Sequence, residues 1–322
     1  MAGACIPTVD LSSFFVEGDE DGKKKATKII SDALSDLGFF QIISHGVPLD
    51  LMDRALELSK RFFQYPDEEK LKSKPIAGSK APLPAGYNRQ PEKLPDKNEY
   101  LLLFVPSPGK SFVSCNVCPR DPPELKETLE ELSFHLTRTA SLMEEILNQC
   151  MGLPSGFIKE FNSNRSTDFI AALRYFPATE HENNGISEHE DGNFFTFVFQ
   201  DEVGGLEVRK DGEWIPVKPT KGTIVVNIGD IIQVLSNNRF KSATHRVVRK
   251  EGQSRHSYAF FCNSDGDKWI EPLPQFTTEI GEAPRYRGFF YKDYMALRMR
   301  NKTHPSAPED VIHIAHYTTI PS

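Results

Sequence analysis

The sequence predicts an all-β core of the jelly-roll (double-stranded β-helix) type with flanking α-helices, α+β overall. Two observations lead to this fold class. After Asp168 the apolar pattern changes from helical spacing to alternation, and short runs rich in β-branched and aromatic residues recur with turn signals between them. Before Asp168, amphipathic stretches at helical spacing indicate helices that pack against the core.

The N-terminal part is expected to alternate strands and helices. Residues 6–11 predict a short strand, and residues 23–37 predict an amphipathic helix that ends at Gly38. A buried strand is expected at 39–44, followed by a second helix at 49–64.

A long irregular region and a long helix follow. Residues 65–120 are rich in Pro, Lys and Gly and contain one strand-like run, 100–105. Loops of this length are usually functional or disordered, so we expect the region to cover a site. Residues 122–152 predict a core helix, because leucines recur at helical spacing after an opening pair of prolines.

The remaining chain predicts the barrel. Asp211-Gly212 is a strong hairpin-turn signal. The expected strands are 169–176, 194–200, 206–209, 214–217, 223–228, 231–235, 244–248 and 255–262, with an aromatic-rich helix at about 284–300. The chain thus divides into an N-terminal cap region, 1–120, core helices, 121–165, the jelly-roll core, 166–280, and a C-terminal helix and tail, 281–322.

Composition limits the possible partners. The chain has 38 Lys and Arg against 45 Asp and Glu, a net charge of −7, and no basic run longer than 23–25, whereas nucleic-acid binding needs clustered positive charge. No apolar stretch is long enough to span a membrane, and the N-terminus lacks the pattern of a secretory signal. Five scattered cysteines fit reduced thiols. We therefore expect a cytoplasmic protein that binds neither nucleic acid nor a membrane. No heptad seam or large apolar surface run indicates a protein partner, so we expect a monomer.

His189, Asp191 and His245 form the most informative pattern in the chain. His189 and Asp191 are two apart, which on an extended strand points both side chains to one face. His245 comes 54 positions after Asp191 (245 − 191), so the fold must bring it back. Two imidazoles and one carboxylate on one side of a metal are the arrangement of non-haem Fe(II) oxygenases.

Arg255 and Ser257 form a second pattern shortly after the third candidate ligand. They also share one face of an expected strand. A guanidinium fork beside a hydroxyl is well suited to hold a carboxylate. The order of three ligands and then a carboxylate clamp predicts a metal site with an anionic ligand next to it.

Further motifs occur in a fixed order along the chain. They are Ile6-Pro7-x-x-Asp10-Leu11, Gly38-Phe39-Phe40-Gln41-x-x-x-His45-Gly46-Val47-Pro48, Gly204-Gly205-Leu206-x-Val208, Asn227-x-Gly229-Asp230 and Ser242-x-x-His245-Arg246-Val247. With these and the two patterns above, the chain resembles the plant-type 2-oxoglutarate- and Fe(II)-dependent dioxygenases (isopenicillin-N-synthase-like) over almost its whole length.

The resemblance implies a reaction and its cofactors. His189, Asp191 and His245 would bind Fe(II), and Arg255 and Ser257 would hold the distal carboxylate of 2-oxoglutarate. O2 would be the second cosubstrate and ascorbate the reductant. A small apolar or aromatic metabolite of plant secondary metabolism would be hydroxylated, demethylated, desaturated or cyclised, with release of succinate and CO2.

One stretch departs from the family pattern. The family usually carries Asn-Tyr-Tyr-Pro before the first ligand, whereas this chain reads Arg174-Tyr175-Phe176-Pro177. Phe176 has no hydroxyl to offer the cosubstrate. We expect Arg174 and Tyr175 to contact 2-oxoglutarate, with Arg174 supplementing the clamp or meeting a polar group of the substrate.

Six aromatic residues are candidates for the substrate wall: Tyr87, Tyr100, Phe104, Phe195, Phe261 and Phe290. Two alternatives to the dioxygenase remain open. An oxidase of the same fold can act without 2-oxoglutarate, as the ethylene-forming oxidases do, and those relatives keep the Arg-x-Ser pair. A non-catalytic receptor could retain the fold, although an intact triad and clamp count against it.

Overall fold

The computed structural model describes residues 6–75, 84–303 and 311–319. Two facing β-sheets form its centre. The large sheet holds, in spatial order, β1 (Thr8–Asp10), β2 (Phe39–Ile43), β10 (Ile224–Ile228), β7 (Phe195–Gln200), β12 (Arg255–Cys262), β5 (Phe169–Tyr175), β4 (Asn98–Phe104) and β3 (Gly86–Arg89). The small sheet holds β6 (Asn184–His189), β11 (His245–Val248), β8 (Leu206–Lys210) and β9 (Glu213–Pro216). The expected double-stranded β-helix is confirmed.

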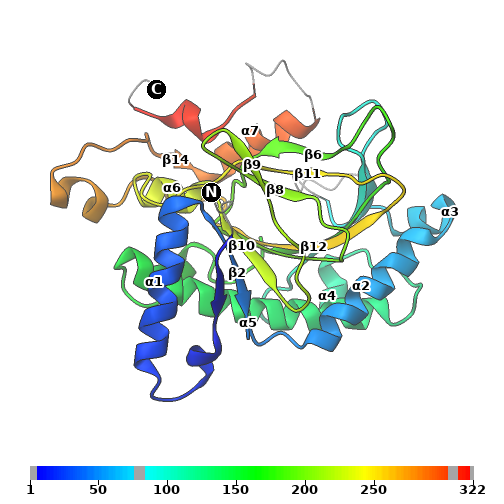
Figure 1. Cartoon of the computed structure of the whole chain (residues 1–322), viewed down its shortest axis with the longest axis horizontal. Helices are drawn as coiled ribbons and strands as arrows, with labels where there is room; N and C mark the ends of the chain where they lie inside the picture. The colour runs from blue at the N-terminus through cyan, green and yellow to red at the C-terminus, as the bar shows by residue number, and fades with distance from the viewer. Residues whose placement is uncertain (1–5, 76–83, 304–310, 320–322) are drawn as a thin grey trace.

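Three long helices cover the outer face of the large sheet: α1 (Glu20–Asp36), α2 (Leu49–Gln64) and α5 (Leu125–Met151). In Figure 1, α2 and α5 lie on one side of the large sheet, and the small sheet and the C-terminal helix lie on its other side. The apolar stripes of these helices pack against outward strand residues such as Phe197 and Phe260 in one continuous core. α5 ends at Gly152, whose φ of 65° suits a glycine.

A second core fills the space between the two sheets. It includes Phe39, Tyr175 and Val225 from the large sheet and Val208 and Val247 from the small one. Successive side chains of a strand point to opposite faces. Each strand of the large sheet therefore gives one set of residues to the helices and the other set to the interior of the barrel.

Several expected elements agree closely with the structure. The helix expected at 49–64 is α2, and the strand expected at 255–262 is β12. α1 begins at Glu20, earlier than expected, because the side chain of Asp19 caps it by accepting from the Gly22 amide.

Other expectations were wrong. Residues 231–235 belong to the helix α6 (Asp230–Leu235) and not to a strand. Every residue of α6 is buried, so its apolar run has no periodicity to distinguish a helix from a strand. β6 was not expected, because it is polar and only partly buried. The C-terminal helix α7 (Tyr291–Thr303) begins later than residue 284.

The N-terminal region contributes to the core sheet as well as covering it. β4 agrees with the strand-like run at 100–105, while β3 and the short helices α3 (Asp67–Lys70) and α4 (Phe112–Cys115) lie in the segment expected to be irregular. β1 and β2 add to one edge of the large sheet and β4 and β3 to the other.

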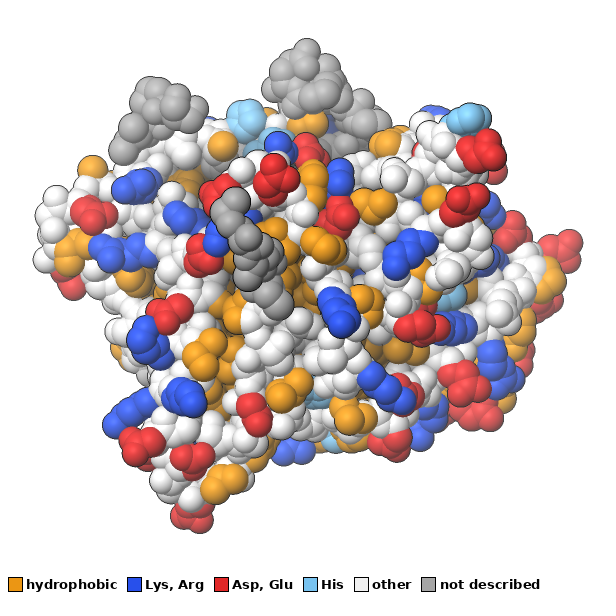
Figure 2. Space-filling model, in the orientation of Figure 1, with side chains coloured by type: hydrophobic (Ala, Val, Ile, Leu, Met, Phe, Trp, Pro, Cys, Tyr) orange, Lys and Arg blue, Asp and Glu red, His pale blue; other side chains and the backbone are white. Residues whose placement is uncertain are grey.

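The surface has mixed charge. On the face shown in Figure 2, acidic and basic side chains are interspersed without a large patch of one sign. Among the described residues, no helix has the length and apolarity needed to cross a membrane.

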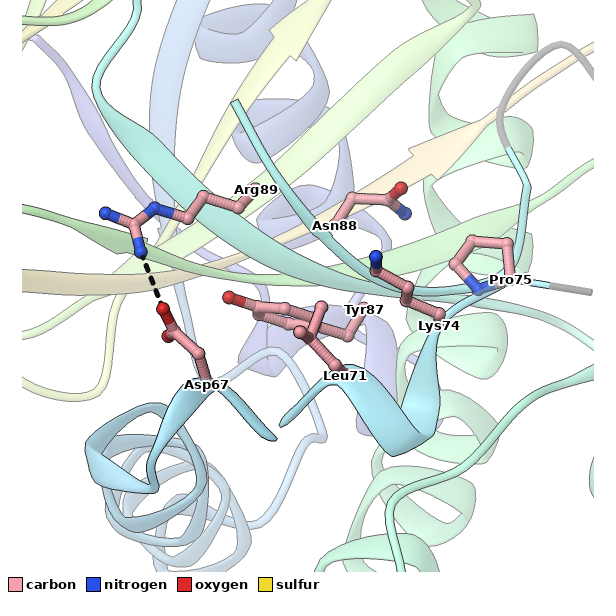
Figure 3. Close-up of a pocket in the computed structure, with 7 residues that line it drawn as sticks. All are labelled: Asp67, Leu71, Lys74, Pro75, Tyr87, Asn88 and Arg89. Atoms are coloured by element: carbon pink, nitrogen blue, oxygen red, sulfur yellow. Dashed lines mark hydrogen bonds and ion pairs between the residues drawn. The ribbon is translucent and has the colours of Figure 1, made fainter. Parts of the chain in front are cut away.

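A buried charge cluster attaches α3 to the outer face of the large sheet. The fully buried Glu99 carboxylate accepts hydrogen bonds from Lys70 Nζ (2.8 Å), Tyr87 Oη (2.6 Å) and Arg174 Nη1 (2.9 Å). Burial and the adjacent Glu99 raise the pKa of Tyr87, so its hydroxyl remains a donor. Figure 3 shows the pocket of about 290 Å³ beside this cluster, which Tyr87 lines together with Asp67, Leu71, Lys74, Pro75, Asn88 and Arg89.

Glu99→Gln should lower the free energy of unfolding by about 3 kcal/mol, because Arg174 loses its paired carboxylate and the buried Lys70 keeps only its ion pair with the exposed Asp67. Urea denaturation measures the loss. The matched control is Glu68→Gln at an exposed position of α3, which should change stability by less than about 0.5 kcal/mol. Equal effects of the two substitutions would contradict the assigned role of the cluster.

Candidate metal centre

The three residues expected to bind a metal come together at the ends of β6 and β11. His189 and His245 are direct cross-strand partners in this antiparallel pair, and Asp191 follows β6 by two residues. His189 Nε2 lies 3.7 Å and His245 Nε2 lies 3.8 Å from Asp191 Oδ1. The candidate ligand atoms of all three lie within 4.8 Å of one another, as one metal ion requires.

Backbone carbonyls fix the tautomers of both imidazoles. His189 Nδ1 is 2.8 Å from the carbonyl of Ser187, and His245 Nδ1 is 3.1 Å from that of Ala243. A carbonyl only accepts, so each Nδ1 carries the hydrogen and each Nε2 keeps its lone pair. Both Nε2 atoms therefore lie beside Asp191 Oδ1.

Asp191 is held as a carboxylate with one oxygen aimed at the imidazoles. Its Oδ2 accepts from Thr196 Oγ1 (2.6 Å) and Asn227 Nδ2 (2.8 Å), which leaves Oδ1 for a metal. Burial would raise the pKa of Asp191, but the positive charge of His245 and His189 in their protonated forms and the two hydrogen bonds lower this pKa to about 2. A bound metal ion would take the place of those imidazole protons. Two neutral imidazoles and one anionic oxygen on one side suit a divalent transition metal.

The second pattern, Arg255 and Ser257, lies on the interior face of β12. Arg255 is 2% exposed, and its Nη1 donates to Ser257 Oγ at 3.0 Å. Its Nε and Nη2 donate to Gln200 Oε1 at 3.2 and 2.8 Å, and the guanidinium lies 4.6 Å from the ring centre of Tyr175. No acidic side chain in the described part of the chain forms an ion pair with Arg255. A buried cation without a counter-charge is costly, so this site calls for an anion.

The strand register arranges the interior residues of β7, β12, β5 and β4 in rows. The first row is Thr196, Phe261, Phe169 and Phe104, the second is Val198, Ala259, Ala171 and Leu102, and the third is Gln200, Ser257, Leu173 and Tyr100. Thr196 in the first row contacts Asp191, and Gln200 and Ser257 in the third contact Arg255. The metal site and the clamp therefore lie at opposite ends of one interior surface.

The structure places Tyr175 beside the clamp and Arg174 away from it. Arg174 is the cross-strand partner of His256, on the face of β5 that points to the helices. Its Nη1 donates to Phe63 O and to Glu99, both at 2.9 Å. The expectation that Arg174 supplements the clamp is thus corrected, although it does share a face with Phe176, whose ring centre lies 5.1 Å from its guanidinium.

Three of the six candidate wall residues face the interior. These are Tyr100, Phe104 and Phe261, and the interior also includes Phe169, which stacks on Phe261 at 4.6 Å. Phe169 was missed because the alternation of a strand does not reveal which of its faces is the interior.

The other three candidates lie elsewhere. Tyr87 and Phe195 belong to the core under the helices, on the opposite face of the large sheet. Phe290 is 44% exposed and packs against Trp269 at the surface. The expectation that these residues form a substrate wall is wrong, because none of them faces the space between the sheets.

Two family models match most of the chain. Residues 167–264 match the 2OG-Fe(II) oxygenase superfamily, and residues 6–125 match the N-terminal region of non-haem dioxygenases in morphine synthesis. The 2-oxoglutarate-dependent dioxygenase 19 of Oryza sativa subsp. japonica is 30% identical over 97% of this chain and 91% of its own length.

Solved structures agree with this match. A dioxygenase for auxin oxidation from rice superposes with a TM-score of 0.78 at 27% identity and covers 97% of this chain and 99% of its own. JOX2 in complex with 2OG, Fe and JA superposes with a TM-score of 0.77 at 28% identity, over 91% of this chain and 84% of its own.

Thr196→Val should weaken metal binding about 10-fold or more, because Asp191 loses a hydrogen bond that orients it. Titration of the apo-protein with Co(II), followed by visible absorbance, measures the Kd. The control is Thr223→Val, which removes a buried hydroxyl bonded to Gln41 and Thr220 away from the ligands. A Kd equally changed in both variants would contradict the specific role of Thr196.

Proposed function

Because this chain belongs to the 2-oxoglutarate- and Fe(II)-dependent oxygenase superfamily, we propose that His189, Asp191 and His245 bind its catalytic iron and that Arg255 and Ser257 bind 2-oxoglutarate. The protein is a 2-oxoglutarate-dependent dioxygenase, an oxidoreductase that acts on a small molecule with Fe(II) and O2. The 2-oxoglutarate-independent oxidase and the receptor are not favoured, since the chain keeps both the metal-binding triad and the buried Arg255 with neutral partners and matches a 2-oxoglutarate-dependent dioxygenase over 97% of its length.

One observation carries the assignment of the cosubstrate site. Arg255 is fully buried at one end of the interior surface, and its hydrogen-bond partners Gln200 and Ser257 are neutral. The distal carboxylate of 2-oxoglutarate would supply the missing negative charge through charge-assisted hydrogen bonds. Its other end would then lie over Ala259, toward the first row and the metal ligands.

Iron, 2-oxoglutarate and O2 supply the oxidising power, with release of succinate and CO2 and with ascorbate as the family's usual reductant. The residues of this chain supply geometry. Thr196 and Asn227 orient the Asp191 carboxylate, and the backbone carbonyls of Ser187 and Ala243 orient the imidazoles. A bulky aromatic row beside the ligands keeps water away from the reacting substrate.

The substrate would lie over β5 and β4, because 2-oxoglutarate occupies the part of the interior over β12. There the first row presents Phe169 and Phe104, and the small Ala171 of the second row leaves space next to them. Tyr100 in the third row offers a hydroxyl, and burial raises its pKa, so it remains a donor. Among the described residues of these strands that face the interior, Arg255 is the one cation, and the cosubstrate uses it.

We therefore propose an uncharged aromatic substrate with a polar group that accepts a hydrogen bond from Tyr100. The aromatic wall gives apolar contact and ring stacking. A substrate carboxylate would find no second cation on this surface. This distinguishes the expected substrate from acids such as auxin, whose oxidation is named for the rice relative.

A cytoplasmic location and a monomeric state are further parts of the proposal. The described cysteines, 115, 118, 150 and 262, are all unpaired, as expected in a reducing compartment. The net charge of −7 gives no support for nucleic acid as a partner. Light scattering after size-exclusion chromatography measures the mass of the particle, and a mass of twice 36.4 kDa would overturn the monomer.

Arg255→Met should raise the Kd of 2-oxoglutarate for the Co(II)-loaded protein by about 10- to 100-fold, because a hydrogen-bonded charge pair is lost. Calorimetric titration measures this Kd. Arg174→Met is the matched control, since Arg174 lies one strand away on the opposite face, and it should leave the Kd unchanged. A Kd raised equally by both substitutions would contradict the assignment of the clamp.

Naringenin, an uncharged flavanone, should increase O2-dependent succinate release more than indole-3-acetate does, because the aromatic wall accepts rings and offers no second cation. Succinate is measured in single turnovers at equal ligand concentration. Phe261→Ala should reduce this difference, since Phe261 stacks on Phe169 beside the metal site. Stronger stimulation by indole-3-acetate would overturn the proposed substrate class.

A further inference from the structure

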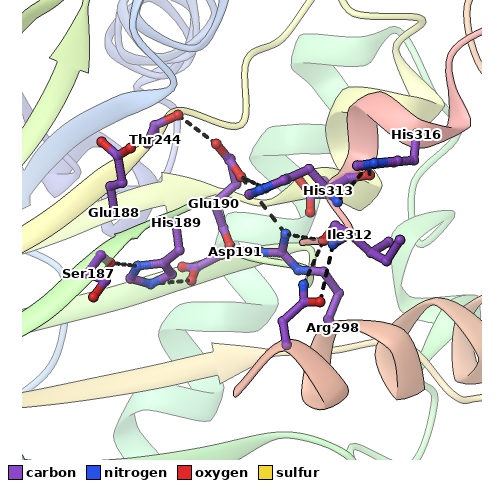
Figure 4. Close-up of polar contacts among 12 residues, drawn as sticks. Ser187, Glu188, His189, Glu190, Asp191, Thr244, Arg298, Ile312, His313 and His316 are labelled. Atoms are coloured by element: carbon purple, nitrogen blue, oxygen red, sulfur yellow. Dashed lines mark hydrogen bonds and ion pairs between the residues drawn. The ribbon is translucent and has the colours of Figure 1, made fainter. Parts of the chain in front are cut away.

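The C-terminal part of the chain packs against the back of the metal site. Figure 4 shows α7 and the segment 311–319 beside the turn that carries His189 and Asp191. Glu190 lies between these two ligands and points to the opposite side, as alternation along a strand requires. Because it points away from the metal side, Glu190 is not one of the metal ligands, and metal binding alone assigns it no role.

Glu190 connects the two segments that carry the metal ligands. Its Oε1 accepts a hydrogen bond from Thr244 Oγ1 at 2.6 Å, and Thr244 directly precedes His245. The ligand turn and the start of β11 are thus joined behind the site by one short side-chain contact.

The side chain of Arg298, on α7, binds the backbone of the same turn. Its Nη2 donates to the carbonyl oxygen of Glu190, and its Nη1 donates to Ile312 O at 3.3 Å. His313 Nδ1 lies 3.1 Å from Glu190 Oε2, and Asn301 and Ile312 exchange hydrogen bonds of 2.8 and 3.2 Å. The guanidinium of Arg298 therefore joins the ligand turn to the C-terminal segment, and its side chain is only 10% exposed.

α7 also supports the two residues that follow Glu190. Asp230 donates its backbone N–H to Asp191 O at 2.8 Å, and its carboxylate accepts from Tyr294 of α7. At Gly192, a Cβ atom would lie 3.1 Å from Met295 Sδ, so the helix packs closely on the turn. Positions 190, 191 and 192 are all held, directly or through Asp230, by α7.

We infer that Arg298 and Glu190 are positioning residues that hold His189, Asp191 and His245 in the metal-binding arrangement, and that metal binding in turn stabilises the segment 311–319. The inference rests on the proposed function, which assigns the metal to these three ligands. Residues that orient metal ligands from outside commonly change metal affinity 10- to 100-fold. Because coupling between two sites is reciprocal, an ordered C-terminal segment favours the metal, and the metal favours the ordered segment.

Co(II) binding to the full-length apo-protein tests the first part, with the visible absorbance of the bound ion as readout. Arg298→Met should raise the Kd of Co(II) about 10-fold or more and alter the shape of the absorption band, because the ligand geometry relaxes. Arg298→Lys should restore part of the affinity. Lys292→Met, at an exposed position of the same helix, should match the wild-type protein.

Hydrogen exchange tests the coupling. Co(II) should slow amide exchange at 311–319 in the wild-type protein and should slow it less in the Arg298→Met variant. If Arg298→Met does not fold, His313→Ala and His181→Ala provide a second pair. His313→Ala should raise the Co(II) Kd about threefold, as the loss of a partly exposed contact to Glu190 implies, and His181→Ala, at an exposed position, should not.

The possible failures are distinct. Wild-type affinity and band shape in Arg298→Met, or equal effects of the two histidine variants, would overturn this inference while leaving the metal assignment intact. Co(II) binding that is unchanged in Asp191→Ala would overturn the proposed metal site itself, and the inference with it.

Discussion

The antiparallel register of β5, β12 and β7 is the constraint on which the site depends. Side chains alternate between a face that packs under the helices and a face that looks into the barrel, and both faces are buried. A slip of one residue would move Arg255 and Ser257 into the apolar layer under the helices and would bring His256 inside. The register is therefore strongly specified, and it fixes the separation between the cosubstrate clamp and Thr196 next to the metal ligands.

Two arginines on adjacent strands show how burial distinguishes structure from function. Arg174 and Arg255 sit at neighbouring positions of the register but point to opposite faces. Arg174 pairs with the buried carboxylate of Glu99, so its charge is compensated within the protein. Arg255 has only neutral partners, so its buried positive charge is compensated when an anionic ligand completes the site. The metal site is the corresponding case with the opposite sign, because Asp191 is an ionised and oriented carboxylate whose charge a bound cation would compensate.

The sequence identified the candidate metal-ligand and clamp residues, but it did not show which face of each strand points into the barrel. The three ligand residues and the Arg-x-Ser pair have spacings that carry chemical meaning, and α2 and β12 have unambiguous apolar patterns. Alternation also showed correctly that Arg174 shares a face with Phe176, but not which face is the interior. That depends on pairing between distant strands, and Tyr87 and Phe195 were misplaced for the same reason.

Contacts between residues far apart in the chain also could not be predicted from the sequence. Glu190 adjoins two ligands in sequence, yet its partner His313 is 123 positions away. All residues of α6, including the polar Asp230 and Gln233, are buried, so no exposed polar face marks it as a helix. In both cases the missing information is tertiary, because a residue's partners are determined by elements far along the chain.

The most direct test of the account is an anaerobic titration of the apo-protein with Fe(II) and then 2-oxoglutarate, with the visible charge-transfer absorbance of the chelate as signal. We expect a band in the wild-type protein that is absent in Asp191→Ala and that bleaches, with succinate formed, when O2 is admitted. Iron binding without this band in the wild-type protein, or an unchanged band in Asp191→Ala, would contradict the assignment of the metal and cosubstrate sites.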